Sequence, residues 1–283
     1  MAEAAGNPLD PGQLFDHVQD TPYFHVPMSL APEGSHGHIY LPQIFGFQIT
    51  KFMVLELVAA ALVIALFGWL AAHLTRHGHA RGRLANMLEV LVMFIRDDVA
   101  RSAVGRQDGD KFFSFLATIF FFILFNNLLG LVPWAGSPTG AFAMTSALAI
   151  ITFLTVIGAG MAKLGVAGFW AAQVPHMELP LLIAIFLKPM IFFLEVLGLF
   201  IKHFVLSVRL LANMVAGHLV LAVMLAFIAV SASEGPLVWY TVTGASISGS
   251  LAISLLELLV AFIQAYIFTF LAALFIGMAV HPH

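Results

Sequence analysis

The residue with the clearest chemical consequence is Arg209, which lies inside an apolar stretch that runs from Phe204 to Val230. His218 is the only other titratable residue of that stretch. A guanidinium near the middle of a bilayer costs about 2.5 to 3.5 kcal/mol on insertion scales. Arginine cannot escape this cost, because it stays protonated at every physiological pH. Such a charge usually marks an ion path or a partner site, the alternative being an arginine held by backbone carbonyls or a lipid headgroup.

Arg209 belongs to a stripe of polar residues that repeats every seven positions: Lys188, Glu195, Lys202 and Arg209. Seven residues turn a helix through about 700°, so these side chains share one face. Asn213 continues the stripe one turn after Arg209. Glu257 and Gln264 are also seven residues apart and are expected to share one face of a later helix.

The segment 231–240, which contains the letters SASEGP, predicts the turn of an antiparallel hairpin. Positions equally distant from such a turn face each other. With the turn centred near residue 236, we expect Gln264 to face Arg209 and Glu257 to face His218, within about one residue. His218 and Arg209 lie on opposite sides of a straight helix, so bending or the use of two faces must reconcile the two pairs.

The composition is that of an integral membrane protein. The 283 residues are 61% hydrophobic and only 10% charged, against about 25% charged residues in ordinary soluble domains. A net charge of −3 gives no electrostatic argument for a nucleic-acid partner. The absence of cysteine excludes disulfides and thiol chemistry. The acidic N-terminal segment lacks the features of a cleavable secretory signal, and we expect none.

We therefore predict an all-α membrane protein with about five membrane helices and one interfacial amphipathic helix. The expected spans are about 52–72, 112–133, 141–162, 179–230 and 247–280, and the interfacial helix covers about 83–104. Packing of that amphipathic helix on the other spans is an equal alternative. The last two stretches exceed one bilayer crossing, so we expect two long, strongly tilted helices in an antiparallel hairpin, bent at Pro180 and Pro189.

Residues 1–50 carry six prolines and are expected to form an irregular segment on the outer side of the membrane, whereas 51–283 form a single membrane domain. Seven of the twelve basic residues lie between positions 73 and 111. This bias predicts a cytoplasmic location for that segment, an N-terminus outside and a C-terminus in the cytoplasm.

The candidate groups on the hairpin each have a structural alternative. His218 and Glu257 suit a proton relay, because histidine titrates near neutrality, but they could form a buried hydrogen bond instead. Asn213 and Gln264 alone would be typical interhelical hydrogen-bonding residues. Glu195 could be a local ion pair with its lysine neighbours rather than a channel residue.

Polar residues elsewhere are expected to be structural. Asn126 and Asn127, near the outer end of their span, are expected to pack or cap. The histidines outside the apolar stretches lack fixed ligand spacing, so we predict no metal and no other cofactor.

Two segments resemble subunit a of the rotary F-type ATP synthases: SVRLLANMVAGH, which contains Arg209, and ELLVAFIQAYIF, which contains Gln264. The resemblance covers about residues 40–280 and includes NLLGLVP and PTGAFAMTSALAIITF. Many bacterial members carry Glu at the position of His218 and His at that of Glu257. This chain has the exchanged pair, as in mitochondrial forms and their bacterial relatives, which leaves open which group takes the proton first.

The resemblance implies a proton-translocating stator subunit with two offset half-channels. Arg209 would face mid-membrane carboxylates on a ring of c subunits and keep the half-channels apart, with Gln264 and Asn213 as its neighbours. His218 and Glu257 would line the outer route. On the inner side the resemblance points to Glu195, and His203, which stands where many members have proline, could add a titratable group.

The resemblance also implies the partners, which are the c-subunit ring, peripheral-stalk b subunits, the remaining ATP synthase subunits and the lipid of a bacterial inner membrane. The chain has no phosphate loop, so ATP chemistry must lie in other subunits. Ion selection should rest largely on the partner carboxylate, which leaves sodium open beside the proton. The alternatives are a self-contained proton-coupled transporter or proton channel, whose usual inverted repeats are not evident, and a structural membrane anchor.

Overall fold

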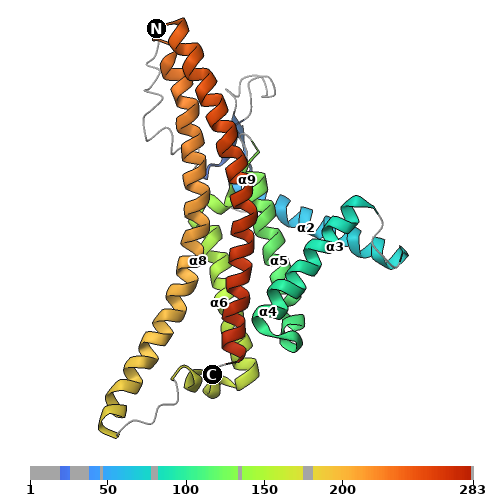
Figure 1. The fold of residues 1–283 in the computed structure, drawn as a ribbon, viewed down its shortest axis with the longest axis vertical. Helices are drawn as coiled ribbons and strands as arrows, with labels where there is room; N and C mark the ends of the chain where they lie inside the picture. Colours follow the sequence, from blue (N-terminus) through green and yellow to red (C-terminus); the bar gives the residue numbers. More distant parts are fainter. Residues whose placement is uncertain are drawn as a thin grey trace. The chain divides into compact units, whose positions relative to one another are not determined.

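The computed structural model describes residues 20–25, 38–44, 47–77, 82–132, 136–174 and 181–281. In these ranges, five helices are long and apolar enough to cross a membrane. They are α2 (Lys51–His77), α5 (Arg106–Gly130), α6 (Phe142–Leu164), α8 (Leu181–Ser231) and α9 (Pro236–Val280), shown in Figure 1. The predicted all-α membrane fold is confirmed. How far the two longest helices tilt in a bilayer stays a prediction.

The hairpin between α8 and α9 has a tighter turn than expected. α8 continues through Pro189 to Ser231, and Pro180 lies outside the described residues. α9 begins at Pro236, directly after Gly235 with a φ of 107°, although we expected the turn to reach position 240 and the apolar helix to begin near 247. Proline suits the first position of a helix, where its missing N–H has no helical partner to lose.

The polar start of α9 is helical because its hydroxyls bond within the helix. The Thr241 hydroxyl donates to the Leu237 carbonyl at 3.0 Å, and the Ser248 hydroxyl donates to the Gly244 carbonyl at 2.9 Å. Satisfied in this way, serine and threonine do not interrupt a helix. α9 therefore includes residues 236–246, which we had expected to lie in the turn or between the turn and the span.

The N-terminal segment contains two short strand pairs in its described part, which differs from the irregular segment that its prolines predicted. β1 (Tyr23–His25) pairs antiparallel with β2 (His38–Tyr40), and β3 (Gln43–Ile44) pairs with β4 (Phe47–Gln48). Residues 1–19, 26–37 and 45–46 lie outside the described residues. The carboxylate of Asp20 accepts a hydrogen bond from the Phe52 amide at 3.1 Å, which caps α2.

The predicted interfacial helix is a series of three helical segments: α3 (Arg83–Phe94), a π-helical turn η1 (Ile95–Ala100) and α4 (Arg101–Val104). Ala85 and Leu88 are buried against Leu70 of α2. Leu84, Met87, Val90 and Met93 are exposed apolar residues of the same helix. One apolar face is thus packed and a second stays free, which suits both interpretations of this amphipathic helix.

The chain forms two compact units. The first comprises residues 1–64, 122–144 and 210–264, and the second comprises residues 65–121, 145–209 and 265–283. Each of the five long helices therefore contributes one stretch to each unit. The 3-10 turn η2 (Pro138–Gly140) belongs to the first unit and α7 (Val166–Ala172) to the second.

Candidate functional site

In the first unit, Glu257 of α9 packs directly against α8 at Gly217. A Cβ atom on Gly217 would lie 2.9 Å from the carboxyl carbon of Glu257 and 3.1 Å from its Cγ, and it would overlap a carboxylate oxygen. Only glycine leaves room for the Glu257 side chain in this position. His218, the predicted partner of Glu257, is the next residue of α8.

His218 and Glu257 each carry a buried polar atom without a partner. No described residue hydrogen-bonds Nε2 of His218 or Oε2 of Glu257. A buried polar atom left in this way costs about 1 to 3 kcal/mol, and such atoms in native structures call for an explanation such as a catalytic role. The two groups could exchange protons with a mobile donor or acceptor, which a fully bonded structural pair could not.

Gln264 is bonded to Asn213 across the same hairpin. The Nδ2 amide of Asn213 donates to Oε1 of Gln264 at 2.8 Å. Gln264 is only 2% exposed, and its Nε2 has no hydrogen-bond partner in the described part of the chain. The bond fixes the orientation of the Gln264 amide and leaves its two N–H donors free for an oxygen acceptor.

Arg209 ends one of the stretches of the second unit, so its expected position opposite Gln264 stays a prediction. The side chain is half-buried. None of the described residues forms a hydrogen bond or an ion pair with it. A permanent cation without an anionic partner among the described residues is suited to a counter-charge on another protein.

The inner-side candidates of the second unit are not brought together. Glu195 and Lys202 are exposed, with a carboxylate oxygen 3.9 Å from the ammonium nitrogen. His203 is only 3% exposed; its ring lies 5.2 Å from that of Phe153 and 5.0 Å from that of Phe275. Nδ1 of His203 bonds the Leu199 carbonyl at 2.9 Å. The imidazole is therefore enclosed by aromatic rings, whereas Glu195 is open.

The first unit contains a buried series of hydrogen bonds between polar side chains that was not predicted from the sequence. The Ser137 and Thr139 hydroxyls are 2.7 Å apart, and Thr139 donates to Oδ1 of Asn127 at 2.8 Å. Nδ2 of Asn127 donates to the Ala261 carbonyl of α9 at 3.3 Å. Asn127 thus links α5 to α9 by a hydrogen bond, which agrees with the packing role that we expected. The adjacent asparagines in an apolar helix were the available signal, but their acceptor is a backbone atom.

Asp108 is the centre of an ion cluster in the second unit. Its oxygens lie 2.8 Å from the Lys111 ammonium, 2.7 Å from that of Lys163 and 3.4 Å from Nε2 of His281. The Asp108 side chain is 7% exposed. The cluster joins the start of α5, the end of α6 and the residue that follows α9, so its role is structural.

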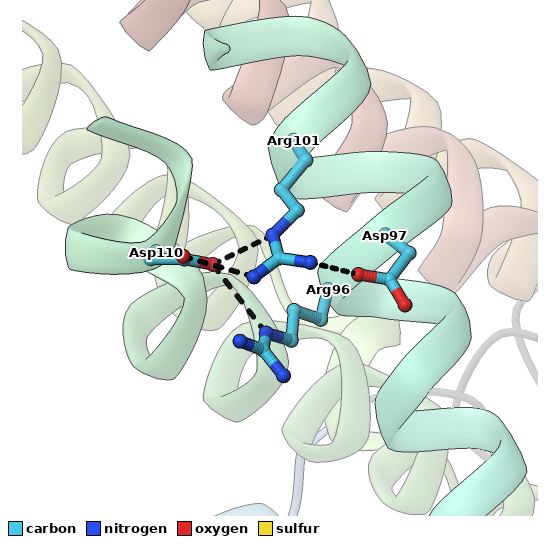
Figure 2. A network of polar contacts seen from close by, with 4 residues as sticks. All are labelled: Arg96, Asp97, Arg101 and Asp110. Carbon is cyan, nitrogen blue, oxygen red and sulfur yellow. Dashed lines mark hydrogen bonds and ion pairs between the residues drawn. The ribbon is translucent and has the colours of Figure 1, made fainter. Parts of the chain in front are cut away.

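A second ion network holds the π-helical turn against α5 (Figure 2). Arg101 donates to both oxygens of Asp110, at 2.8 and 2.9 Å, and to Asp97 at 2.7 Å. Arg96 donates to the same Asp110 at 3.4 Å. Pairing with Asp110, and then with Asp97, raises the pKa of the Arg101 guanidinium above its ordinary value. The two arginines of this network are matched by two aspartates, whereas no ion pair of Arg209 is formed among the described residues.

The comparison with known families decides which protein this geometry belongs to. A family model described as ATP synthase A chain matches residues 53–277. The chain belongs to the ATP synthase subunit a family. The predicted membership is thereby confirmed, and so is the function that it carries: this is the ion-translocating, non-catalytic subunit of F0, the membrane part of the ATP synthase, and it conducts protons.

Relatives named as subunit a align along most of the chain. The identity to ATP synthase subunit a of Myxococcus xanthus is 40%, over 94% of this chain and 88% of the relative. For the subunit a of Chloroherpeton thalassium it is 41%, over 86% of this chain and 71% of the relative. ATP synthase subunit a 2 of Prosthecochloris aestuarii is 38% identical, over 94% of this chain and 78% of the relative.

Proposed function

We propose that this subunit provides two offset half-channels to and from carboxylates on a ring of c subunits. Glu257 and His218 line the outer half-channel, and Glu195 lines the inner one. Arg209 separates the two. His203, which has a buried Nε2 without a partner among the described residues, is a weaker inner-side candidate, because Phe153 and Phe275 enclose its ring.

The observation that carries this proposal is the packing of Glu257 against Gly217, beside His218. Glu257 packs on the residue that precedes His218 in α8, and the carboxylate and the imidazole each have a buried polar atom without a partner among the described residues. A carboxylate and an imidazole can both take up and release a proton near neutral pH when their surroundings permit it.

In the proposed cycle a proton enters from outside, passes Glu257 and His218, and neutralises a carboxylate of the ring. The neutral site can then rotate into lipid, because burying an uncharged carboxyl group costs far less than burying an ion. After nearly a full turn the site reaches the inner half-channel near Glu195 and releases the proton. Each charge that crosses the potential supplies about 2.3 kcal/mol per 100 mV.

Arg209 stabilises the ring carboxylate after it has lost its proton, because an opposite charge favours the ionised form. The same fixed cation prevents a proton from passing directly between the half-channels. Gln264, held by Asn213, can donate from its amide N–H groups to a ring carboxylate, and its Oε1 oxygen can accept from Arg209, in both cases without adding charge. This cycle requires no permanent acidic partner for Arg209, and none is found in the described part of the chain, since the counter-charge arrives and leaves with the ring.

The same proposal sets the partners and the placement of the subunit. It contacts the c ring, the peripheral-stalk b subunits and the other subunits of the complex in a bacterial inner membrane. The N-terminus lies outside and the C-terminus in the cytoplasm, as the concentration of basic residues between positions 73 and 111 favours.

The rival is a self-contained proton channel or transporter, and reconstitution separates the two. We expect liposomes that hold this subunit alone to show no voltage-driven proton flux above the lipid background, and liposomes with the whole ATP synthase to couple the flux to ATP synthesis. A Glu257→Gln complex serves as the site control and should synthesise ATP at a strongly reduced rate. Sustained flux through the isolated subunit would support the rival.

A further inference from the structure

The buried polar chain Ser137–Thr139–Asn127 ends on α9 between two residues of the proposed proton path. Asn127, Thr139 and Ser137 are 0%, 0% and 2% exposed. Their acceptor, the Ala261 carbonyl, lies one helical turn after Glu257 and three residues before Gln264. A hydrogen bond at this carbonyl fixes the axial position of that turn of α9 relative to α5.

Gly136 and Ser137 are packed closely against two helices. A Cβ on Gly130, at the end of α5, would lie 2.5 Å from Cβ of Ser137. Gly136 has a φ of 75°, and a Cβ there would lie 3.0 Å from both Nζ of Lys51 and Cε1 of Phe52. Two glycines thus permit the close approach of loop and helices, and the hydroxyls of the loop are held in place.

The chain of bonds also selects the orientation of the Asn127 amide. Thr139 donates to Oδ1 of Asn127, so Nδ2 must face Ala261. Without the Thr139 hydroxyl, the amide could flip or leave the carbonyl. A shift of α9 by one residue is about 1.5 Å along its axis, which is enough to move the Glu257 carboxylate away from its place at Gly217.

We propose that Asn127 is a positioning residue for proton transfer. Oriented by Thr139, it bonds the Ala261 carbonyl and thereby fixes the axial position of α9, and of Glu257 and Gln264 with it, relative to α5. This inference rests on the proposed function of Glu257 and Gln264. It adds a role for α5 and its following loop, which contribute no proton-transfer group of their own.

The test uses whole ATP synthase in inverted membrane vesicles, with Thr139→Val as the main variant because valine keeps the shape and removes the hydroxyl. Thr139→Ser restores the hydroxyl. Thr155→Val is the matched control, since the Thr155 hydroxyl bonds only the Ile151 carbonyl of its own helix. The rate of proton-driven ATP synthesis is divided by the amount of assembled complex and followed against the pH inside the vesicles, which is the outer side.

We expect Thr139→Val to lower the rate per complex at least about tenfold, as small misplacements at a reacting centre do, and to change its dependence on outer-side pH. Thr139→Ser and Thr155→Val should match the wild type. Asn127→Leu should repeat the Thr139→Val result, and if it does not assemble, Thr139→Val decides. A wild-type rate and pH profile for Thr139→Val would overturn the inference, as would a loss confined to the amount of assembled complex.

An Arg209→Ala complex measured in parallel keeps the two proposals apart. Full synthesis in that variant would contradict the proposed function itself, whatever Thr139→Val does. Loss of synthesis in Arg209→Ala, together with wild-type behaviour of Thr139→Val, would overturn only the positioning role of Asn127.

Discussion

The carboxylate of Glu257 occupies the space that a side chain at Gly217 would fill. The two residues belong to the two arms of the hairpin, and Gly217 directly precedes His218 in α8. A titratable group in a membrane protein is usually turned towards the protein interior or a water-filled cavity. Here the position of the Glu257 carboxylate is determined by the facing helix α8, which has no side chain at Gly217.

Gly217→Ala should therefore disturb proton transfer by displacing Glu257. The added Cβ would lie 2.9 Å from the carboxyl carbon, so either the side chain or the helix must move. We expect proton-driven ATP synthesis per assembled complex to fall between about tenfold and a hundredfold. Gly158→Ala is the matched control, because a Cβ there meets nothing within 4 Å. Equal rates for the two variants would contradict the proposed importance of this contact.

The register of the hairpin can be tested by disulfide formation, since the chain has no cysteine of its own. Cysteines at positions 217 and 257 should form a disulfide readily on mild oxidation. A Cβ at Gly217 lies 3.1 Å from Cγ of Glu257, which is one bond from the Cβ of Glu257. The two Cβ atoms are therefore near the separation of about 3.5 to 4.5 Å that a disulfide requires. Cysteines at positions 217 and 253 are one turn out of register and should not join. Mass spectrometry of the linked peptides identifies the pair, and preferential joining of 217 with 253 would show a different register.

Asp108→Asn should destabilise the subunit, because it removes the only carboxylate shared by Lys111 and Lys163 among the described residues. The measurement is the thermal unfolding midpoint of the purified complex together with the amount of this subunit retained in it. Asp98→Asn is the control, since Asp98 is exposed on the adjoining π-helical turn. The Asp108 variant should unfold at the lower temperature, and identical midpoints would argue that the cluster contributes little.

Arg101→Lys should weaken the network of Figure 2, because the single ammonium nitrogen of lysine cannot reproduce the planar group of three nitrogens that donate to Asp110 and Asp97. A raised pKa means that the folded protein holds the Arg101 proton more tightly than the unfolded chain. That contribution is fully present below the ordinary arginine value and is lost only at higher pH, so it is constant from pH 6 to 9. The difference in unfolding midpoint between variant and wild type should be equal at both limits. Arg106→Lys, an exposed residue, should show no difference at either pH.

The helices and the membrane class were predictable from the sequence because long apolar stretches leave few alternatives in a bilayer. From the position of the turn alone we expected Glu257 to face His218, and in the structure it packs on the neighbouring residue, Gly217. The start of α9 was predicted too late, since its serine and threonine hydroxyls bond the preceding turn of the same helix and so are accommodated in it.

Two contacts were out of reach of sequence reasoning for physical reasons. Gly217 has no side chain, so nothing in its chemistry pointed to the carboxylate that packs on it. Asn127 and Ala261 are separated by 134 residues, and the acceptor is a backbone carbonyl that every residue possesses. Such a bond depends on how α5 and α9 pack, which residue types and spacings do not specify.

The central claim is that Arg209 keeps two half-channels apart, and the most direct test measures ATP synthesis and passive proton conductance in the same vesicles with Arg209→Ala. Without the cation the ring carboxylate loses its counter-charge and the two half-channels can connect. We predict that ATP synthesis is abolished while proton conductance through the membrane part persists. Wild-type ATP synthesis in the Arg209→Ala complex would contradict the account.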